Sequence, residues 1–153
     1  KARGYKGLIY HNHGVGNNDF LRVCGADCNG TFLPASPVLV AAQLPVDHPA
    51  KRLALDYIAR FEAQHGAGSV SAFGSYTWDA GLLLGNAIPI ALKTAAPGTP
   101  EFRLALRDAL EATRGLADSN GIVNMSTTDH LGLDQRARVM VEIRDGKWVY
   151  QAR

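Results

Sequence analysis

Two short apolar runs near the start of the chain flank a segment with helical spacing. The run 7–10 (Gly-Leu-Ile-Tyr) lies between polar residues, which is typical of a buried strand. A short helix capped by Asn17 or Asn18 should follow, because asparagine is a favourable N-cap. The run 31–33 predicts a second strand. Strand, helix and strand in this order are typical of a βαβ unit with parallel strands.

Four prolines between residues 34 and 49 change the character of the chain. Proline lacks a backbone donor, so this segment predicts a connector rather than a helix or a central strand. Three helical patterns follow, over 49–64, 71–96 and 99–110. The second is apolar on nearly all sides, and we expect a buried helix that is kinked or split near Pro89.

The last third of the chain predicts a short strand, a loop and a hairpin. The strand is expected at 122–123 and the polar loop at 129–134. Residues 139–143 alternate between apolar side chains and polar or flexible ones, which predicts the first strand. Asp145-Gly146 supplies a tight turn, and 148–150 forms the second strand of the hairpin. The whole order, with its two irregular connectors, fits two incomplete lobes joined by crossing strands better than one compact domain.

Composition narrows the class of protein without naming a function. The 153 residues are 46% hydrophobic and 20% charged, which is enough apolar surface for a globular core. A formal net charge of +2 gives no electrostatic case for binding nucleic acid. Polar residues and prolines interrupt the longest apolar stretch, 80–96, so we expect no membrane span. The chain starts at Lys1 without a targeting segment, and we expect a fragment of a longer protein.

The local motifs do not predict an enzyme. His11 and His13 could share a face of an extended segment, but no third zinc ligand is suitably spaced. Segment 14–19 is similar to a dinucleotide fingerprint, yet Asp19 stands where a pyrophosphate would approach, which favours a plain strand-to-helix turn. No Gly-x-Ser-x-Gly motif is present. We therefore expect no catalytic residue, no metal and no cofactor.

The two cysteines, Cys24 and Cys28, are four positions apart, which is not the Cys-x-x-Cys redox spacing. In a regular helix this separation brings the Cα atoms within disulfide range but does not aim the Cβ atoms at each other. We therefore expect two free thiols that behave as small buried apolar residues, rather than a disulfide.

Taken in order, the motifs resemble the C-terminal portion of a type I periplasmic solute-binding protein of the branched-chain amino acid (Leu/Ile/Val-binding) ABC transporter family. The resemblance extends over essentially the whole chain. Its carriers are a strand followed by Gly-Val-x-Asn in 7–17, Cys-Asn-Gly-Thr-Phe at 28–32, Trp-Asp-Ala at 78–80, Thr-Pro-Glu-Phe-Arg at 99–103 and Gly-Ile-Val-Asn-Met at 121–125.

The resemblance implies an α/β fold: a fragment of a two-lobe protein with parallel sheets flanked by helices and lobes joined by crossing hinge strands. It implies that surfaces normally covered by the rest of each lobe, including 8–10 and 82–84, are exposed and let the fragment self-associate. The implied division is 1–34 in the C-terminal lobe, 35–46 as a hinge crossover, 47–127 in the N-terminal lobe, and 128–153 as a second crossover with a C-terminal-lobe hairpin.

The function implied by the resemblance is that of a periplasmic, non-enzymatic solute-binding component of an ABC importer. Such a protein captures a small organic solute between its lobes by hinge closure and delivers it to a membrane permease. The solute would be similar to a branched-chain amino acid, or be an amide or an aromatic or other organic acid. The alternative is the ligand-sensing domain of a receptor or regulator, because the same fold serves both.

The candidate ligand-binding residues are His13, Phe73, Tyr10, Asn12 and Tyr76. Relatives often place an acid before Gly-Val-x-Asn to hold a ligand's amino group, but this chain has His13 there. An imidazole can donate to a carboxylate or carbonyl instead, which favours an acid or amide over an amino acid. Phe73 matches a position that lines the apolar pocket in relatives. Tyr10, Asn12 and Tyr76 are candidates by adjacency.

The aromatic stripe around Phe73 and Tyr76 includes Trp78, three large rings at helical spacing. Such a stripe ordinarily forms helix core or a cap on it. Its alternative role is the wall of a site for an apolar ligand.

Overall fold

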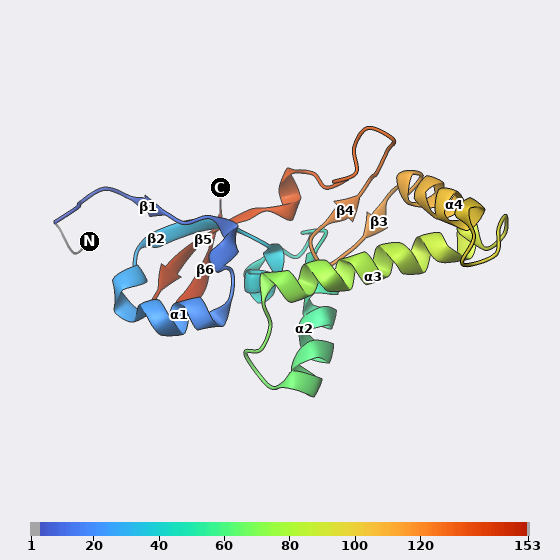
Figure 1. Ribbon diagram of the computed structural model, residues 1–153. Helices are drawn as coiled ribbons and strands as arrows, with labels where there is room; N and C mark the ends of the chain where they lie inside the picture. The colour runs from blue at the N-terminus through green and yellow to red at the C-terminus, as the bar shows by residue number, and fades with distance from the viewer. Residues whose placement is uncertain (1–3, 153) are drawn as a thin grey trace.

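The computed structural model describes residues 4–152, so the expectation drawn from Lys1 lies outside the described part of the chain. In Figure 1 the larger sheet and α1 lie on one side of the molecule, and α3 and α4 extend to the other. Helix α2 lies below the start of α3 in this view. No helix within residues 4–152 is long and apolar enough to cross a membrane.

The larger sheet brings the two ends of the chain together. Its strands are bonded in the order β1-β2-β5-β6, and β1 and β2 are parallel, as the βαβ pattern predicts. β5 and β6 continue the sheet in antiparallel fashion, so the sheet is mixed. The bounds are β1 (Ile9–Tyr10), β2 (Thr31–Ala35), β5 (Val139–Arg144) and β6 (Lys147–Gln151).

Local signals account for the connections within this sheet. Helix α1 (Asn18–Cys24) begins after Asn17, whose side chain accepts a hydrogen bond from the Phe20 backbone N–H at 2.9 Å. The predicted hairpin between β5 and β6 is confirmed. Its turn residues Asp145 and Gly146 have φ of 50° and 68°, the paired positive values of a type I′ turn.

Pro34 corrects the expectation that the proline-rich segment contains neither helix nor central strand. It lies inside β2 and is paired with Met140. The carbonyl of Phe32 accepts a hydrogen bond from His11 N at 2.7 Å, so the backbone of Phe32 faces β1. Pro34 faces the same side two residues later, beyond the end of β1, where its missing N–H breaks no strand pairing. A 3₁₀ helix, η3 (Pro37–Gln43), follows directly.

The expectation of two free thiols is also wrong, because Cys24 and Cys28 form a disulfide with a Cα–Cα distance of 5.7 Å. The reason is that the helix does not continue through both positions. Helix α1 ends at Cys24, and Gly25 adopts a φ of 52°, which glycine tolerates best. A 3₁₀ turn, η2 (Gly25–Cys28), then redirects the chain and lets the two side chains meet.

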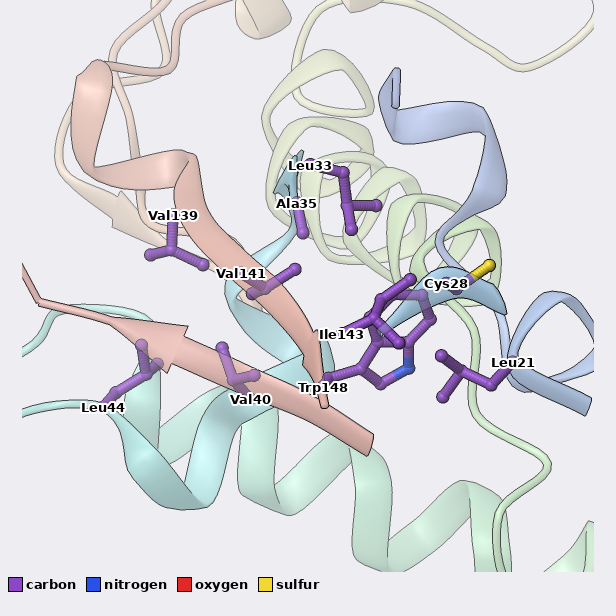
Figure 2. Packing of buried hydrophobic residues seen from close by; sticks show 10 residues of the cluster. All are labelled: Leu21, Cys28, Leu33, Ala35, Val40, Leu44, Val139, Val141, Ile143 and Trp148. Carbon is purple, nitrogen blue, oxygen red and sulfur yellow. The ribbon is translucent and has the colours of Figure 1, made fainter. Parts of the chain in front are cut away.

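One face of the larger sheet forms the main core, drawn in Figure 2. Leu33, Val141 and Ile143 alternate along β2 and β5 and are fully buried. Trp148 on β6 closes this cluster and donates from Nε1 to Asn18 Oδ1 at 3.1 Å. The other buried members are Leu21, Cys28, Ala35, Val40, Leu44 and Val139.

The helical half contains three helices and a small sheet. The predicted helices 49–64 and 99–110 are present; Gly66 ends α2, and Thr99 caps α4. The predicted strand β4 is present and pairs with β3, which the sequence analysis did not identify. The bounds are α2 (Lys51–His65), α3 (Ala72–Ala91), α4 (Pro100–Glu111), β3 (Leu116–Ala117) and β4 (Ile122–Val123).

Helix α3 is neither split nor buried on all sides, contrary to the sequence-based expectation. It runs through Pro89 without a break, because this proline lies in the last turn and little helix remains to be deflected. Its buried positions are Ala72, Ser75, Asp79, Ala87 and Ala91, all small or polar. Large apolar residues such as Leu84 and Ile90 are exposed, since α4, α2 and η3 cover only part of the helix.

Apolar side chains are exposed on two surfaces where the resemblance implied exposure. Leu8 and Tyr10, at the β1 edge of the larger sheet, are 63% and 59% exposed. Leu84 on α3 is exposed, whereas Leu82 and Leu83 are half-buried. Self-association through these surfaces stays a prediction.

A second, smaller core joins η3, α2 and α3 around Tyr57. Tyr57 is 1% exposed and contacts Trp78, with ring centroids 5.6 Å apart. Trp78 therefore packs against this core, which agrees with the helix-core interpretation of the aromatic stripe rather than with the wall of a ligand site. Among the described residues the Tyr57 hydroxyl has no hydrogen-bond partner. A Cβ atom added to Gly74 would lie 2.4 Å from this hydroxyl oxygen but 3.7 Å from Tyr57 Cζ.

We expect Gly74→Ala to destabilise the wild-type chain, because its methyl group would collide with the Tyr57 hydroxyl. In a Tyr57→Phe background the same change should stabilise by up to about 1 kcal/mol, since alanine favours a helix more than glycine does. Tyr57→Phe alone should not lower stability, because it removes a buried unpaired hydroxyl. Urea unfolding of the four proteins measures these effects. An equal loss from Gly74→Ala in both backgrounds would contradict this account.

Candidate functional site

A hollow of about 670 Å³ lies between the larger sheet and the helical half. It is lined by residues from both places where the chain passes between these halves, 34–36 at the end of β2 and 131–138 before β5. His13 contributes from the sheet side, and Tyr76 and Asn120 from the helical side. A site built at two chain crossings can hold a small molecule between the two halves.

Strand register brings the two connecting segments together. The last registered pair of β2 and β5 is Ala35 with Val139, so one step further Ser36 lies opposite Arg138. Both line the hollow. Arg138 is also the C-cap residue of a short 3₁₀ helix, η4 (Gln135–Ala137), and its backbone N–H bonds to Gln135 O at 3.3 Å. The backbone at Arg138 is thus restrained by η4 before it and by strand β5 after it.

His13 and Tyr76 are the two sequence-predicted residues that the structure brings to this hollow. His13 begins η1 (His13–Val15), just beyond the carboxyl end of β1. Tyr76 lies in the second turn of α3. The start of α3 is tied to the His13 segment, because Ala72 N–H donates to Gly16 O at 3.0 Å.

The other three predicted residues lie outside the lining of the hollow. Asn12 caps η1, where its side chain accepts from Gly14 N–H at 2.8 Å. Tyr10 is exposed at the sheet edge, with its ring 5.6 Å from that of Phe32. Phe73 is 44% exposed, and its ring is nearly perpendicular to that of Tyr76 with the centroids 6.5 Å apart, so it neighbours a lining residue without lining the hollow.

Three charged groups near the hollow were not identified from the sequence. Asp134 receives three bonds from Arg136, of 2.6–3.0 Å, and these bonds lower the pKa of Asp134 to about 2. Arg138, by contrast, has no carboxylate partner within residues 4–152. No local motif marks these residues, because they become neighbours of His13 and Tyr76 only when the sheet forms.

A buried polar cluster supports the base of the hollow through Asn120. Asn120 accepts from Ser36 Oγ at 2.6 Å and donates to Asp79 Oδ2 at 2.6 Å. Asp79 Oδ1 also accepts from Ser119 N–H at 2.9 Å. Asn120 therefore joins the connecting segment at Ser36 to the middle of α3, and it is 2% exposed.

The carboxylates of this cluster are held in an unfavourable environment. Burial raises the pKa of Asp79, and its bonds from Ser119 and Asn120 oppose this only in part. Burial and the nearby Asp79 charge raise the pKa of Asp118 as well. Burial raises the pKa of Tyr76, whereas the positive charge of Arg138 acts to lower it. Arg138 therefore acts electrostatically on a residue of the opposite wall.

A second hollow, of about 400 Å³, lies on α4 and is lined mainly by apolar atoms. Leu106, Leu110 and Met125 border it, and His130 at its rim bonds to Glu111 at 3.0 Å. Its lining residues differ from those of the larger hollow, although His130 is the sequence neighbour of Leu131, which lines the larger one. Within the described ranges, no three His, Cys, Asp or Glu side chains are grouped so that they could hold a metal ion.

Extracellular ligand-binding receptors are among the solved structures with closely similar folds. An extracellular ligand-binding receptor from Rhodopseudomonas palustris HaA2 is 37% identical, with a TM-score of 0.92 over 99% of this chain. The Rp1789 protein of R. palustris strain CGA009 is 39% identical, with a TM-score of 0.91 over 97% of this chain. The chain spans 42% of the length of each.

More distant structures share the fold alone. A leucine-binding protein from Thermotoga maritima is 20% identical, with a TM-score of 0.68. The alignment covers 99% of this chain and 38% of the length of the leucine-binding protein. A type 1 periplasmic binding protein from Bordetella pertussis is 17% identical, with a TM-score of 0.69. The alignment covers 94% of this chain and 38% of the length of the Bordetella protein. The chain has the fold of the type I periplasmic binding proteins over about two fifths of their length. No family model matches it, and no curated protein does.

The likeness to type I periplasmic binding proteins confirms the resemblance predicted from the sequence and the α/β fold class. The Rp1789 protein and the leucine-binding protein align with 97% and 99% of this chain, whereas the chain spans only 42% and 38% of their lengths. Among the structures of this fold are an extracellular ligand-binding receptor and a leucine-binding protein. The type I periplasmic binding fold therefore supports a solute-binding role for the chain.

Proposed function

We propose that this chain supplies part of the ligand cleft of a periplasmic solute-binding protein that serves an ABC importer. The hollow at the two chain crossings carries this proposal. It places His13 and Arg138 from the sheet side opposite Tyr76 and Asn120 from the helical side. Such an arrangement lets a small organic solute contact both halves, and the protein needs no catalytic group for this role.

The proposed lobe division follows the same two crossings. The larger sheet, made from the two ends of the chain, would belong to the C-terminal lobe. The unit of α2, α3, α4 and the β3-β4 sheet would belong to the N-terminal lobe. The crossovers 35–46 and 128–138 would then act as hinge segments, and a bound solute would favour the closed arrangement.

A screen for bound solutes tests the proposal. The chain is heated with increasing amounts of branched-chain amino acids, aromatic acids and amides, and the melting temperature is recorded. A ligand that binds only the folded state must raise this temperature in a concentration-dependent way. A parallel ligand-observed NMR screen detects weaker complexes. A chain that binds no member of any of the three classes would contradict the proposed function.

A sensing role for the same cleft is the second candidate, because three similar structures are described as extracellular ligand-binding receptors. Deletion of the gene in its host separates the two roles. Loss of uptake of the labelled solute supports the importer role. Unchanged uptake with an altered response to the solute supports sensing.

We expect His13→Ala to lower the affinity for a carboxylate ligand by about 1.5–3 kcal/mol, the range for a hydrogen bond to a charged group. His13→Glu should abolish binding of the same acid through like-charge repulsion. The matched control is His130→Ala, which removes the same side chain from the other hollow. Calorimetric titration measures all three variants. Unchanged affinity in His13→Ala would show that His13 is only a polar residue at the end of a strand.

A further inference from the structure

We infer that Arg138 is the fixed positive charge that selects a carboxylate-bearing solute over its uncharged analogue in the hollow between the two halves. This inference rests on the proposed solute-binding function and names the ligand class. Its basis is a guanidinium that has no carboxylate partner within residues 4–152 and lies in the same hollow as His13 and Tyr76.

The fold fixes the position of Arg138. Val139, the next residue, is 8% exposed and directs its side chain into the main core. Side chains alternate along a strand, so Arg138 is directed away from that core and lines the hollow. Ser36 lies opposite it by strand register, and the bond to Gln135 O restrains its backbone. The guanidinium therefore extends from a restrained backbone.

The charges around the hollow leave Arg138 without compensation. Asp134 is the carboxylate that lines the hollow, and Arg136 engages both of its oxygens. Asp79 and Asp118 are buried beneath Asn120 and bond to amide groups of the 118–121 segment. Within the described part of the chain no carboxylate pairs with Arg138. The hollow therefore has a net positive charge on the sheet side.

The chemistry of the guanidinium suits a carboxylate. Its parallel N–H groups match the two oxygens of a carboxylate and can donate to both. The opposite wall contributes the Tyr76 ring, against which the apolar part of a solute can rest. A carboxylate at one end and an apolar or aromatic body at the other are thus the features that this hollow recognises.

The test compares each acid with its own primary amide, which has nearly the same shape but no charge. Phenylacetate, phenylacetamide, 4-methylpentanoate and 4-methylpentanamide are titrated into the ¹⁵N-labelled chain at constant ionic strength, and dissociation constants are taken from chemical-shift changes. In the wild-type chain the acids should bind at least about tenfold more tightly than the amides.

Arg138→Gln should weaken binding of the acids by about tenfold to a hundredfold and leave the amides unchanged, so the preference disappears. Arg138→Lys should retain part of it, because the charge remains but the two-pronged geometry does not. Arg144→Gln is the matched control. It removes the same charge from an exposed residue of β5 that pairs with Glu142, outside the hollow, and should keep the preference.

Each outcome decides the inference. Loss of the acid preference in Arg138→Gln, with its retention in Arg144→Gln, supports the role of Arg138. Equal binding of acids and amides by the wild-type chain, or a preference that survives Arg138→Gln, overturns it while solute binding stands. Equal loss in both arginine variants would show a general charge effect and also overturn it. Failure of all four probes to bind would count against both this inference and the proposed function for these ligand classes.

Discussion

Trp148→Ala should lower the free energy of unfolding by about 3–5 kcal/mol, the largest effect that we expect from a single substitution in this chain. Trp148 is 7% exposed and closes the main core beside Ile143, its partner across the β5-β6 hairpin. Removal of the indole would leave a cavity that the surrounding sheet and α1 cannot fill. The hydrogen bond from Nε1 to Asn18 would be lost as well.

Two further substitutions separate packing from hydrogen bonding at this position. Trp148→Phe should cost less than Trp148→Ala, because it keeps a ring in the core and loses the bond to Asn18. Val149→Ala is the matched control, since Val149 is the next residue on β6 and is only half-buried. Urea unfolding followed by circular dichroism measures the three variants. A cost below about 1 kcal/mol for Trp148→Ala would show that the core can close without the indole.

Asn120→Ala should lower the free energy of unfolding by about 3 kcal/mol at neutral pH, because two buried groups, one of them a carboxylate, each lose a hydrogen bond. Ser36 Oγ would lose its acceptor, and Asp79 Oδ2 would lose its donor at 2.6 Å. Asp79 is 6% exposed, so water cannot readily replace the amide. Since Asn120 also lines the hollow, the variant should weaken solute binding.

The pH dependence identifies the lost bond to Asp79. In the wild-type chain burial raises the folded-state pKa of Asp79 above its ordinary value of 3.8, and the Asn120 donor limits this rise. Without that donor the folded-state pKa rises further. The ionised form, present as pH increases above 3.8, then costs more stability. The effect of Asn120→Ala should therefore be smaller below pH 3.8, where Asp79 is protonated in both states.

An exposed asparagine on α3 provides the control. Asn86→Ala removes an amide without a hydrogen-bond partner among the described residues, and it should change stability by less than about 0.5 kcal/mol. An Asn120→Ala cost that is no larger than this, or that does not depend on pH, would mean that the cluster is not a structural link between Ser36 and α3.

Sequence alone determined the elements whose signals are local. The Asn17 cap, the Thr99-Pro100 helix start and the Asp145-Gly146 turn each depend on residues within a few positions of one another. The parallel pairing of β1 and β2 also follows from the sequence, because a short helix between two apolar runs favours a crossover connection. The order of these signals carried the resemblance to the type I periplasmic binding fold, which the structure comparisons confirm.

Local reasoning was wrong where a neighbour distant in sequence, or a change in direction of the chain, decides the outcome. Pro34 is acceptable in β2 only because β1 ends beside it. The bridge between Cys24 and Cys28 forms because Gly25 redirects the chain. The exposure of α3 depends on which of its sides α2, α4 and η3 cover, and the apolar composition of the helix does not contain that information.

In the candidate site, too, some features follow from the sequence alone and others only from the tertiary structure. The position of His13 before Gly14 made it a candidate from sequence alone, and so did the place of Tyr76 beside Phe73. Only the tertiary structure decided that His13 and Tyr76 share one hollow with Arg138 and Asn120. The physical reason is that a strand register and a buried amide network join segments 34–36, 75–79 and 118–138. Such joins depend on contacts between distant residues, which a pattern along the chain cannot express.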